Sequence, residues 1–291
     1  MDFAAHLKEL RLGAGLSQEK LAEQLGVSRQ VVTKWETGRG TPDMDNLIAL
    51  SRLFGISADQ LLLTGAVPAP AGGTSYESVT EYDVAEAKRF SFKLWNVRQV
   101  TLTGSSSEKL IVRLSSQTLP QLQQDFKISL DDVRGRLDVE LNRRGDVSRA
   151  AAREGLDVTI ELPQAYVRRA ELKTVADLLA VGPLACEDLE VDGKLQSLLV
   201  DGFSGALEIN CNQDMQIDCR ALTGSLDVNQ LSAITRVRIG RDMPVSARCR
   251  GLGNSLYFER GGQSVPDFSD PEAETVIELN GVKSELFICA D

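Results

Sequence analysis

Hydrophobic residues in the N-terminal part of the chain recur with helical spacing. Apolar side chains three or four residues apart form separate runs, which include Leu7 and Leu10, Leu21 and Leu25, Val32 and Trp35, and Leu47 and Leu50. Side chains at this spacing lie on one face of an α-helix. With one more run before residue 64, the pattern predicts five short amphipathic helices in residues 1–64.

Residues that start and stop helices stand at the ends of these runs. Ser17 and Ser28 precede helical runs, where a serine hydroxyl can accept a hydrogen bond from a free backbone N–H group. Gly26, Gly38 and Gly55 each follow a run, where the chain needs a left-handed residue to leave the helix. The caps therefore support the same helices as the apolar spacing.

The hydrophobic period changes from helical to alternating after residue 80. Residues 65–80 contain Pro and Gly and have no apolar period, which is typical of an exposed linker. Beyond them, apolar residues alternate with polar ones around Val100 and Leu102, Leu110 to Leu114, Leu137 to Leu141, and Leu156 to Leu162. Alternation predicts β-strands, so residues 81–291 are predicted to form an all-β domain.

A loose repeat runs through the β region. Its units are LEVDG from residue 189, LLVDG from 198, LEINCN from 207, MQIDC from 215 and SLDVN from 225, and their starts advance by 9, 9, 8 and 10 residues. Each unit has an apolar pair followed by Asp or Asn. Strands this short cannot bury their own faces, which favours the stacked rungs of a β-solenoid over a sandwich of very short strands.

Composition places the chain among ordinary soluble globular proteins. Of its 291 residues, 42% are hydrophobic and 25% are charged. No stretch approaches the roughly 18 apolar residues of a membrane span, and the N-terminus lacks the pattern of a signal peptide, so we expect a cytoplasmic protein with no membrane contact. His6 is the only histidine, which excludes Ser-His-Asp and Cys-His catalysis and multi-histidine metal sites within one chain.

The N-terminal region carries a recognisable motif. The segment LSQEKLAEQLGVSRQVVTKWETG predicts a helix, a Gly-containing turn and a second helix. Together with TPDMDNLIALSRLFGISADQLL, it resembles the lambda-repressor-like, XRE-type DNA-binding domains. The resemblance covers residues 1–64 and implies a helix-turn-helix domain, double-stranded DNA as partner and transcription regulation as function, with repression as the expected mode.

The second helix of the motif holds the candidate base-reading residues. Arg29 and Gln30 lie in its N-terminal turn, the part that a major groove can receive. Arg pairs with guanine O6 and N7 and Gln with adenine N6 and N7, each worth about 1–3 kcal/mol of discrimination. Thr33 lies on the same face, and Lys34 faces either a base or the backbone. We expect these four residues to read bases.

Phosphate contacts are expected from residues around the motif. Gln18 opens the first helix, where a side-chain amide and free backbone N–H groups can hold phosphate, and the resemblance implies the same role. Three more residues are predicted to contact phosphate: Thr37, Arg39 and Asn46. The resemblance also implies that Arg11 and Glu36 form a structural pair between helix 1 and helix 3.

The charge distribution limits how DNA can be bound. Residues 1–64 have 7 basic and 8 acidic side chains, whereas residues 65–291 have 25 basic and 34 acidic ones. We therefore expect few phosphate contacts in the first domain and repulsion of nucleic acid by the second. One motif reads only a few base pairs, so we expect a homodimer on two half-sites about 34–36 Å apart, with the β domain serving for self-association or for sensing a ligand or protein partner.

The β domain offers little chemistry. The segment LDVTIELPQAYVRRAELKTVADLLAVGPL and the repeats after it resemble the adhesin-type class of β-solenoid domains of unknown function, which has no catalytic residues to transfer. The alternation points Cys211, Cys219 and Cys249 inward, and no CxxC spacing predicts zinc. A thiol or metal sensor stays open as an alternative if Cys211 and Cys219 meet.

Asp and Asn residues at the corners of the repeat suggest a second alternative. These residues are Asp192, Asp201, Asn210 and Asp218. They could bind calcium, although Asp and Asn also favour corners because they tolerate turns. We expect neither a metal nor a cofactor.

Two rival functions remain open. The first is a scaffold protein whose helical module binds protein rather than DNA. The second is an enzyme that uses acidic residues of the β domain, but no paired-carboxylate motif can be placed there. We expect a multidomain chain, helical and then all-β, that regulates transcription and is not an enzyme.

Overall fold

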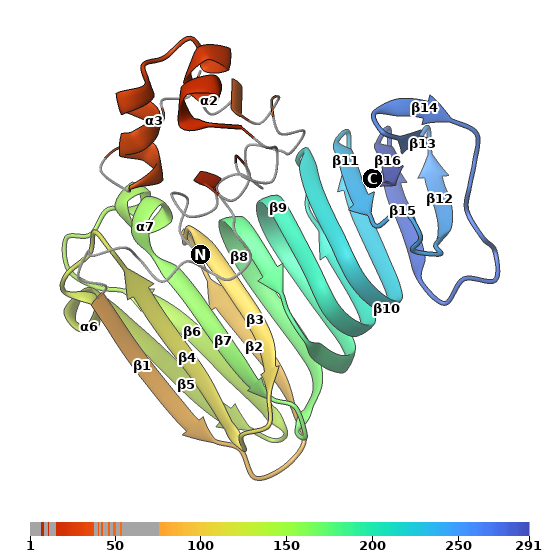
Figure 1. The fold of residues 1–291 in the computed structure, drawn as a ribbon. Helices are drawn as coiled ribbons and strands as arrows, with labels where there is room; N and C mark the ends of the chain where they lie inside the picture. Colours follow the sequence, from red (N-terminus) through yellow and green to blue (C-terminus); the bar gives the residue numbers. More distant parts are fainter. Residues whose placement is uncertain are drawn as a thin grey trace. The chain divides into compact units, whose positions relative to one another are not determined.

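The computed structural model describes residues 7, 8, 11, 16–37, 40, 42, 46, 49, 50, 53 and 76–290. Contacts divide the chain into two compact units, Met1–Thr74 and Ser75–Asp291. Each unit has its own hydrophobic core. Figure 1 shows helices in the first unit and a long array of strands in the second.

The N-terminal unit contains the predicted helix-turn-helix pair, α2 (Gln18–Leu25) and α3 (Arg29–Glu36). Ser17 caps α2, because its hydroxyl accepts a hydrogen bond of 3.1 Å from the Lys20 N–H. Gly26 ends α2 in the left-handed conformation, at φ 68°. Ser28 occupies the N-cap position of α3, but its hydroxyl accepts no capping bond, so that detail of the prediction is wrong.

The prediction of five helices in this unit is not confirmed. The described part of the chain contains four helices, and only α2 and α3 belong to the N-terminal unit. The other three predicted segments lie largely outside the described residues. The core follows the predicted apolar positions, and its buried side chains are Leu7, Leu21, Ala22, Val32, Trp35 and Leu50.

The second unit is built from strands with two short helices. Its first strands are β1 (Tyr76–Asp83), β2 (Lys88–Leu94), β3 (Gln99–Ser105), β4 (Lys109–Ser116), β5 (Phe126–Val133), β6 (Arg136–Arg143), β7 (Asp157–Pro163) and β8 (Val167–Val181). The later strands are β9 (Leu184–Asn210), β10 (Met215–Leu231), β11 (Ile234–Ile239), β12 (Ser246–Leu252), β13 (Ser255–Arg260), β14 (Gln263–Val265), β15 (Val276–Val282) and β16 (Glu285–Ala290). The helices are α6 (Leu122–Asp125) and α7 (Arg149–Gly155).

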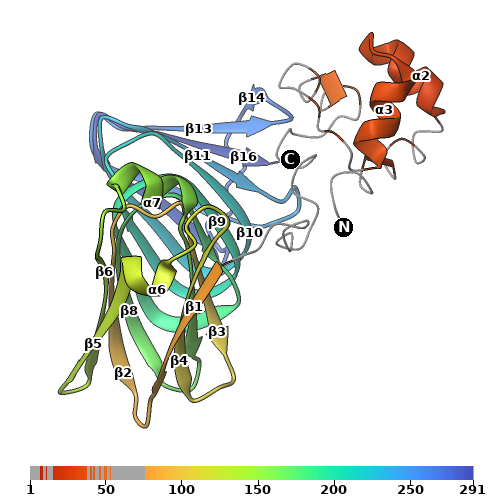
Figure 2. The same cartoon turned by 90° about the vertical axis from the view of Figure 1, so that its left-hand side faces the viewer.

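The strands form two faces that share β8, β9 and β10. One face runs in the order β1-β4-β7-β3-β8-β9-β10-β11-β16-β13-β14. On the other face, β5, β6 and β2 precede β8, while β15 and β12 follow β10. The long strands cross from one face to the other, since the first part of β8 pairs with β2 and its end pairs with β3. Figure 2 shows the two faces side-on, with β5, β6 and β2 on one side and β1, β4 and β3 on the other.

The predicted repeat corresponds to half of a longer structural period. Strands β8, β9 and β10 pair in parallel between residues 19 positions apart, as in Leu198 with Ile217 and Leu207 with Leu226. In these pairs a repeat unit is therefore stacked on the unit two places before it, and not on the one directly before it. Buried ladders result, because Leu207, Leu226 and Ile277 are neighbours on adjacent strands and are all fully buried.

Glycines occupy the corners where adjacent backbones come closest. Gly205 has φ +140° and Gly224 has φ +122°. A Cβ at Gly224 would lie 2.2 Å from the Gly205 carbonyl oxygen, and a Cβ at Gly205 would lie 1.9 Å from the Cys186 oxygen. Such distances are far below van der Waals contact, so these corners require glycine.

The outermost strands β1 and β5 are joined by polar contacts. The Tyr82 hydroxyl of β1 donates a hydrogen bond of 2.6 Å to Asp132 of β5, and the Lys88 ammonium donates one of 2.7 Å to the same carboxylate. The helix α6 ends where β5 begins, at the other end of these strands, and contacts β1, β4 and β5. Strand β1 begins at Tyr76, so residues 76–80 of the predicted linker are strand. β1 pairs with β4 and stands first in the strand order, at an edge of the sheet. Its residues are mostly polar, so its sequence lacks the apolar alternation that marks the inner strands.

Within the described residues, none of the helices has the length and apolar character needed to cross a bilayer.

A glycine substitution tests the close contact between corners. We expect Gly224→Ala to lower the free energy of unfolding by at least about 2 kcal/mol more than Gly135→Ala, because the new methyl group meets a backbone oxygen. Gly135 is a matched control with φ +78° and open space around it, where alanine adds only about 1–2 kcal/mol of backbone strain. Urea unfolding followed by the β-sheet circular dichroism signal measures both, and equal losses would contradict the prediction.

Candidate nucleic-acid interface

A buried ion pair connects the first helical segment with α3. The Arg11 Nε donates a hydrogen bond of 2.5 Å to Glu36 Oε1, and its Nη2 donates one of 3.1 Å to Glu36 Oε2. The third donor, Arg11 Nη1, bonds the Leu16 carbonyl oxygen at 2.7 Å. Both charged side chains are less than 10% exposed, at 9% for Arg11 and 2% for Glu36. The pair thus orients α3 from inside the unit.

The environment of Glu36 keeps its carboxylate ionised. Burial raises the pKa of Glu36, but hydrogen bonds from Arg11 and Gln18 and the positive charges of Arg11 and Lys8 together outweigh it, so the pKa of Glu36 is lowered. The hydrogen bond to Glu36 raises the pKa of Arg11 against the opposing effect of burial. The two residues therefore remain a charged pair at neutral pH.

Gln18 extends this network from α2 to α3. Its Nε2 donates a hydrogen bond of 2.7 Å to Glu36 Oε2, and its Oε1 accepts one of 3.2 Å from the Thr33 hydroxyl. The sequence suggested Gln18 for phosphate and Thr33 for bases. In this structure both half-buried side chains contribute to the packing of α2 against α3, which no local sequence pattern indicates.

The other three candidate base-reading residues lie on the open side of α3. Arg29, Gln30 and Lys34 are exposed, and within the described residues their side chains form no hydrogen bond or ion pair. Arg29 and Gln30 are the first two residues of α3. An exposed guanidinium and an exposed amide at a helix start have the donors and the reach for base edges in a major groove.

The remaining predicted phosphate contacts have different surroundings. Thr37 is exposed at the end of α3, and its hydroxyl donates a hydrogen bond of 2.7 Å to the Thr33 carbonyl oxygen. Asn46 is helical and half-buried. Arg39 lies outside the described residues. The structure thus leaves three unengaged polar side chains on α3 as the centre of the candidate interface.

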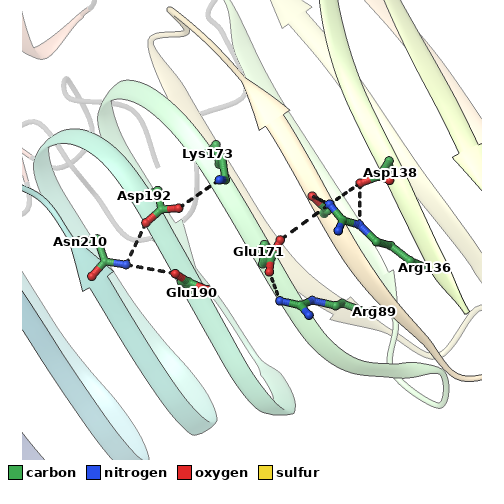
Figure 3. A network of polar contacts seen from close by, with 9 residues as sticks. Arg89, Arg136, Asp138, Glu171, Lys173, Glu190, Asp192 and Asn210 are labelled. Atoms are coloured by element: carbon green, nitrogen blue, oxygen red, sulfur yellow. Dashed lines mark hydrogen bonds and ion pairs between the residues drawn. The ribbon is translucent and has the colours of Figure 1, made fainter.

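Corner residues of the second unit were an alternative site for calcium. Figure 3 shows that Asp192 lies between Lys173 and Asn210, and that the Asn210 amide also bonds Glu190. The Lys173 ammonium is 3.5 Å from Asp192, and the Asn210 amide nitrogen donates a hydrogen bond of 2.8 Å to it. Asp192 thus already has an ammonium group and an N–H donor of the protein as partners.

The same face carries an extended polar network. Glu171 forms ion pairs with Arg89 and, at 3.9 Å, with Arg136 (Figure 3). Burial raises the pKa of Glu208, and the nearby Glu190 raises it further. Carboxylates are thus dense enough on this face to disfavour one another's charge, which would also disfavour a phosphate backbone.

The cysteines divide into buried and accessible thiols. Cys211 and Cys219 are 1% exposed, as the alternation predicts. The prediction for Cys249 is wrong, because Cys249 is exposed. Cys249 of β12 pairs with Leu279 of β15, whose side chain is buried. Among the described strands β12 pairs with β15 alone, so β12 is an edge strand and Cys249 stays exposed. Burial raises the pKa of Cys219 to about 12 and that of Cys186 to about 11, so neither is a ready nucleophile.

Substitution of Glu36 tests the buried pair. We expect Glu36→Gln to destabilise the helical unit by about 3 kcal/mol at pH 7, because Arg11 keeps its charge in a buried place without a counterion. Urea unfolding followed by Trp35 fluorescence in a Trp95→Phe background measures this loss. Glu23→Gln, an exposed glutamate on α2, is the control and should change stability by less than about 0.5 kcal/mol.

The same pair predicts a pH dependence. Because the folded-state pKa of Glu36 is lowered, its stabilising effect is complete above the unfolded pKa near 4.5 and is lost as the pH falls through the lower folded value. The difference in stability between the unsubstituted protein and Glu36→Gln should therefore be constant from pH 7 to 6 and shrink below about pH 4.5. A difference that stays constant to lower pH would show that the ion pair does not stabilise the unit.

Thiol labelling tests the assignment of the cysteines. At pH 8 we expect Cys249 to react first with an aromatic disulfide reagent, while Cys211 and Cys219 react only after unfolding. With a pKa of about 12, Cys219 would be a thiolate in only about one molecule in ten thousand even without steric protection. The Cys249→Ser variant should lose the fast phase, and a fast phase that survives would contradict the assignment.

Comparisons with known proteins identify the first region. The helix-turn-helix family model matches residues 7–61. The HTH-type transcriptional activator BcrR of Enterococcus faecalis is 48% identical over 62 residues, which cover 21% of this chain and 30% of BcrR. The SPbeta prophage-derived uncharacterized HTH-type transcriptional regulator YonR of Bacillus subtilis is 42% identical over 60 residues, which cover 21% of this chain and 56% of YonR.

A solved structure also matches a larger part of the chain. A solved structure of a "putative cell adhesion protein" from Clostridium sporogenes matches 75% of this chain and all of its own, with 12% identity and a TM-score of 0.37. The regulators named above share only the N-terminal region with this chain, over 30–56% of their own lengths. The chain thus has an N-terminal helix-turn-helix domain, matched over residues 7–61, which is followed by a large region built mainly of strands.

Proposed function

We propose that this chain is a sequence-specific DNA-binding regulator of transcription and not an enzyme. In this proposal α3 enters the major groove and Arg29 and Gln30 read base edges. Thr33 and Lys34 complete the base-reading set. The residues proposed to contact phosphates are Gln18, Thr37, Arg39 and Asn46. The names of BcrR and YonR, both HTH-type transcriptional regulators, support this class of function.

One observation supports the proposal most strongly. Glu36 and Thr33 of α3 are engaged with the rest of the unit, whereas Arg29, Gln30 and Lys34 on its other side are exposed and unengaged within the described residues. A helix oriented by its buried side presents its exposed side with little conformational freedom. Preorganisation of this kind lowers the entropy lost on binding.

The charges suit specific rather than general DNA binding. Residues 1–64 have a net charge of -1, and residues 65–291 have a net charge of -9. Non-specific affinity depends on the number of neutralised phosphates. The chain would therefore bind random DNA weakly and depend on base contacts for its affinity.

The second unit would serve for oligomerisation or for sensing a ligand or partner. We propose that it is a β-solenoid-like stack, and the 19-residue parallel register of β8, β9 and β10 supports this. Two copies of the chain would place two copies of α3 on half-sites about one helical turn, or 34–36 Å, apart. The proposed mode is repression. BcrR is named an activator, so a promoter–reporter fusion should measure directly whether this chain represses or activates transcription.

Selection from a randomised duplex library tests the function. We expect the full-length protein to enrich one site with two-fold symmetry, and the Arg29→Ala, Gln30→Ala double variant to lose that preference. Each base contact is worth about 1–3 kcal/mol, so the preference should fall at least about tenfold. The matched control is Lys20→Ala, Gln24→Ala, which removes the same kinds of side chain from the exposed surface of α2. It should enrich the same site.

The same selection distinguishes DNA reading from the rival scaffold function. A scaffold whose helical unit binds protein would enrich no site, and its activity would be unchanged by the Arg29→Ala, Gln30→Ala substitutions. Enrichment of the same site by the double variant would show that other residues read the bases.

A further inference from the structure

The second unit contains a cavity far in sequence from the helix-turn-helix region. Its volume is about 440 Å³, within the range of about 300–1,000 Å³ that is usual for ligand pockets. Its apolar lining includes Phe126 of β5, Leu141 of β6 and Val175 of β8. Phe126 and Leu141 are buried, at 4% and 8% exposure, so the cavity has a rigid floor that belongs to the core.

An exposed tryptophan forms one side of this cavity. Trp95 is 46% exposed, although it follows the fully buried Leu94 at the end of β2. The turn that presents it is held by the two residues that follow it. Asn96 adopts the left-handed conformation with φ 59°, and the Val97 N–H donates a hydrogen bond of 3.1 Å to the Val175 carbonyl oxygen. A large aromatic ring is therefore positioned at the mouth of an apolar cavity by its backbone.

Two unpaired arginines border the same cavity. Arg143 and Arg149 line it, both are exposed, and within the described residues neither side chain forms an ion pair or a hydrogen bond. Other arginines near this end of the unit are neutralised. Arg153 pairs with Asp177 at 2.8 Å, and Arg98 pairs with Asp157.

The charge at this cavity differs from that of the rest of the unit. Residues 65–291 have a net charge of -9, and many of their basic side chains are in ion pairs. Two guanidinium groups without partners at one apolar cavity are thus a local positive site in an acidic domain. Guanidinium groups match carboxylate and phosphate geometry, and tryptophan packs well against flat apolar groups.

We propose that this cavity binds a small amphipathic anion. Its apolar body would lie against Trp95 and the floor formed by Phe126, Leu141 and Val175, and its carboxylate would accept hydrogen bonds from Arg143 and Arg149. The proposal deepens the sensing role proposed above for the second unit. Binding to the cavity is measured without DNA, so its failure is distinguishable from a failure of the proposed DNA-binding function.

Two probes of nearly the same shape, one charged and one neutral, test the proposal. Isothermal titration calorimetry of the full-length protein compares 1-naphthaleneacetate with 1-naphthaleneacetamide, which has the same aromatic body and no charge. We expect saturable one-site binding of the acid, with a Kd at least about tenfold lower than that of the amide, because the charged hydrogen bonds are made only with the acid.

Variants assign the binding to this cavity. The Arg143→Gln, Arg149→Gln variant should lose the preference for the acid, and Trp95→Ala should weaken both probes. The control variant, Arg168→Gln with Arg241→Gln, removes the same charge from two other exposed arginines and should bind as the unsubstituted protein does. All of these positions are exposed, so folding should be unaffected, and circular dichroism checks this.

Three results would overturn the proposal. The first is the absence of saturable binding of the acid, and the second is equal affinity for acid and amide. The third is an unchanged preference in the Arg143→Gln, Arg149→Gln variant, which would place the binding elsewhere on the protein.

Discussion

The buried ion pair between Arg11 and Glu36 is the interaction on which the geometry of the helical unit depends. Three donors of Arg11 are used, two on Glu36 and one on the Leu16 carbonyl oxygen, and Gln18 adds a fourth hydrogen bond to the same cluster. A buried charge without its partner is far more costly than the pair, so α3 cannot rotate without breaking the cluster. The exposed side of α3, with Arg29 and Gln30 at its start, is oriented as a consequence.

The second unit is stabilised by a different constraint, the close stacking of backbones 19 residues apart. Corner glycines let successive layers approach, and fully buried ladders such as Leu207, Leu226 and Ile277 fill the interior. One of its faces carries several carboxylates, among them Asp192 and Glu208, and the net charge of -9 for residues 65–291 disfavours nucleic acid. The two units thus divide the proposed work, with base reading in the small unit and assembly or sensing in the large one.

The sequence predicted the features that depend on local patterns. The Ser17 cap, the Gly26 stop, the buried face of α3 and the alternating strands all depend on neighbours a few residues away. It did not predict the Gln18 and Thr33 contacts, the 19-residue period or the exposure of Cys249, because these depend on which distant segments become neighbours. The cavity at Trp95 was missed for the same reason, since its lining residues come from segments up to 80 positions apart.

The central claim is that Arg29 reads a guanine in the major groove, and base-analogue substitution tests it most directly. In the duplex enriched by the protein, each guanine in turn is replaced by 7-deazaguanine, which lacks the N7 acceptor that a bidentate arginine needs. The account predicts one position in each half-site where this replacement weakens the unsubstituted protein about tenfold and leaves the Arg29→Ala variant unchanged. Equal weakening of both proteins at every guanine would contradict it.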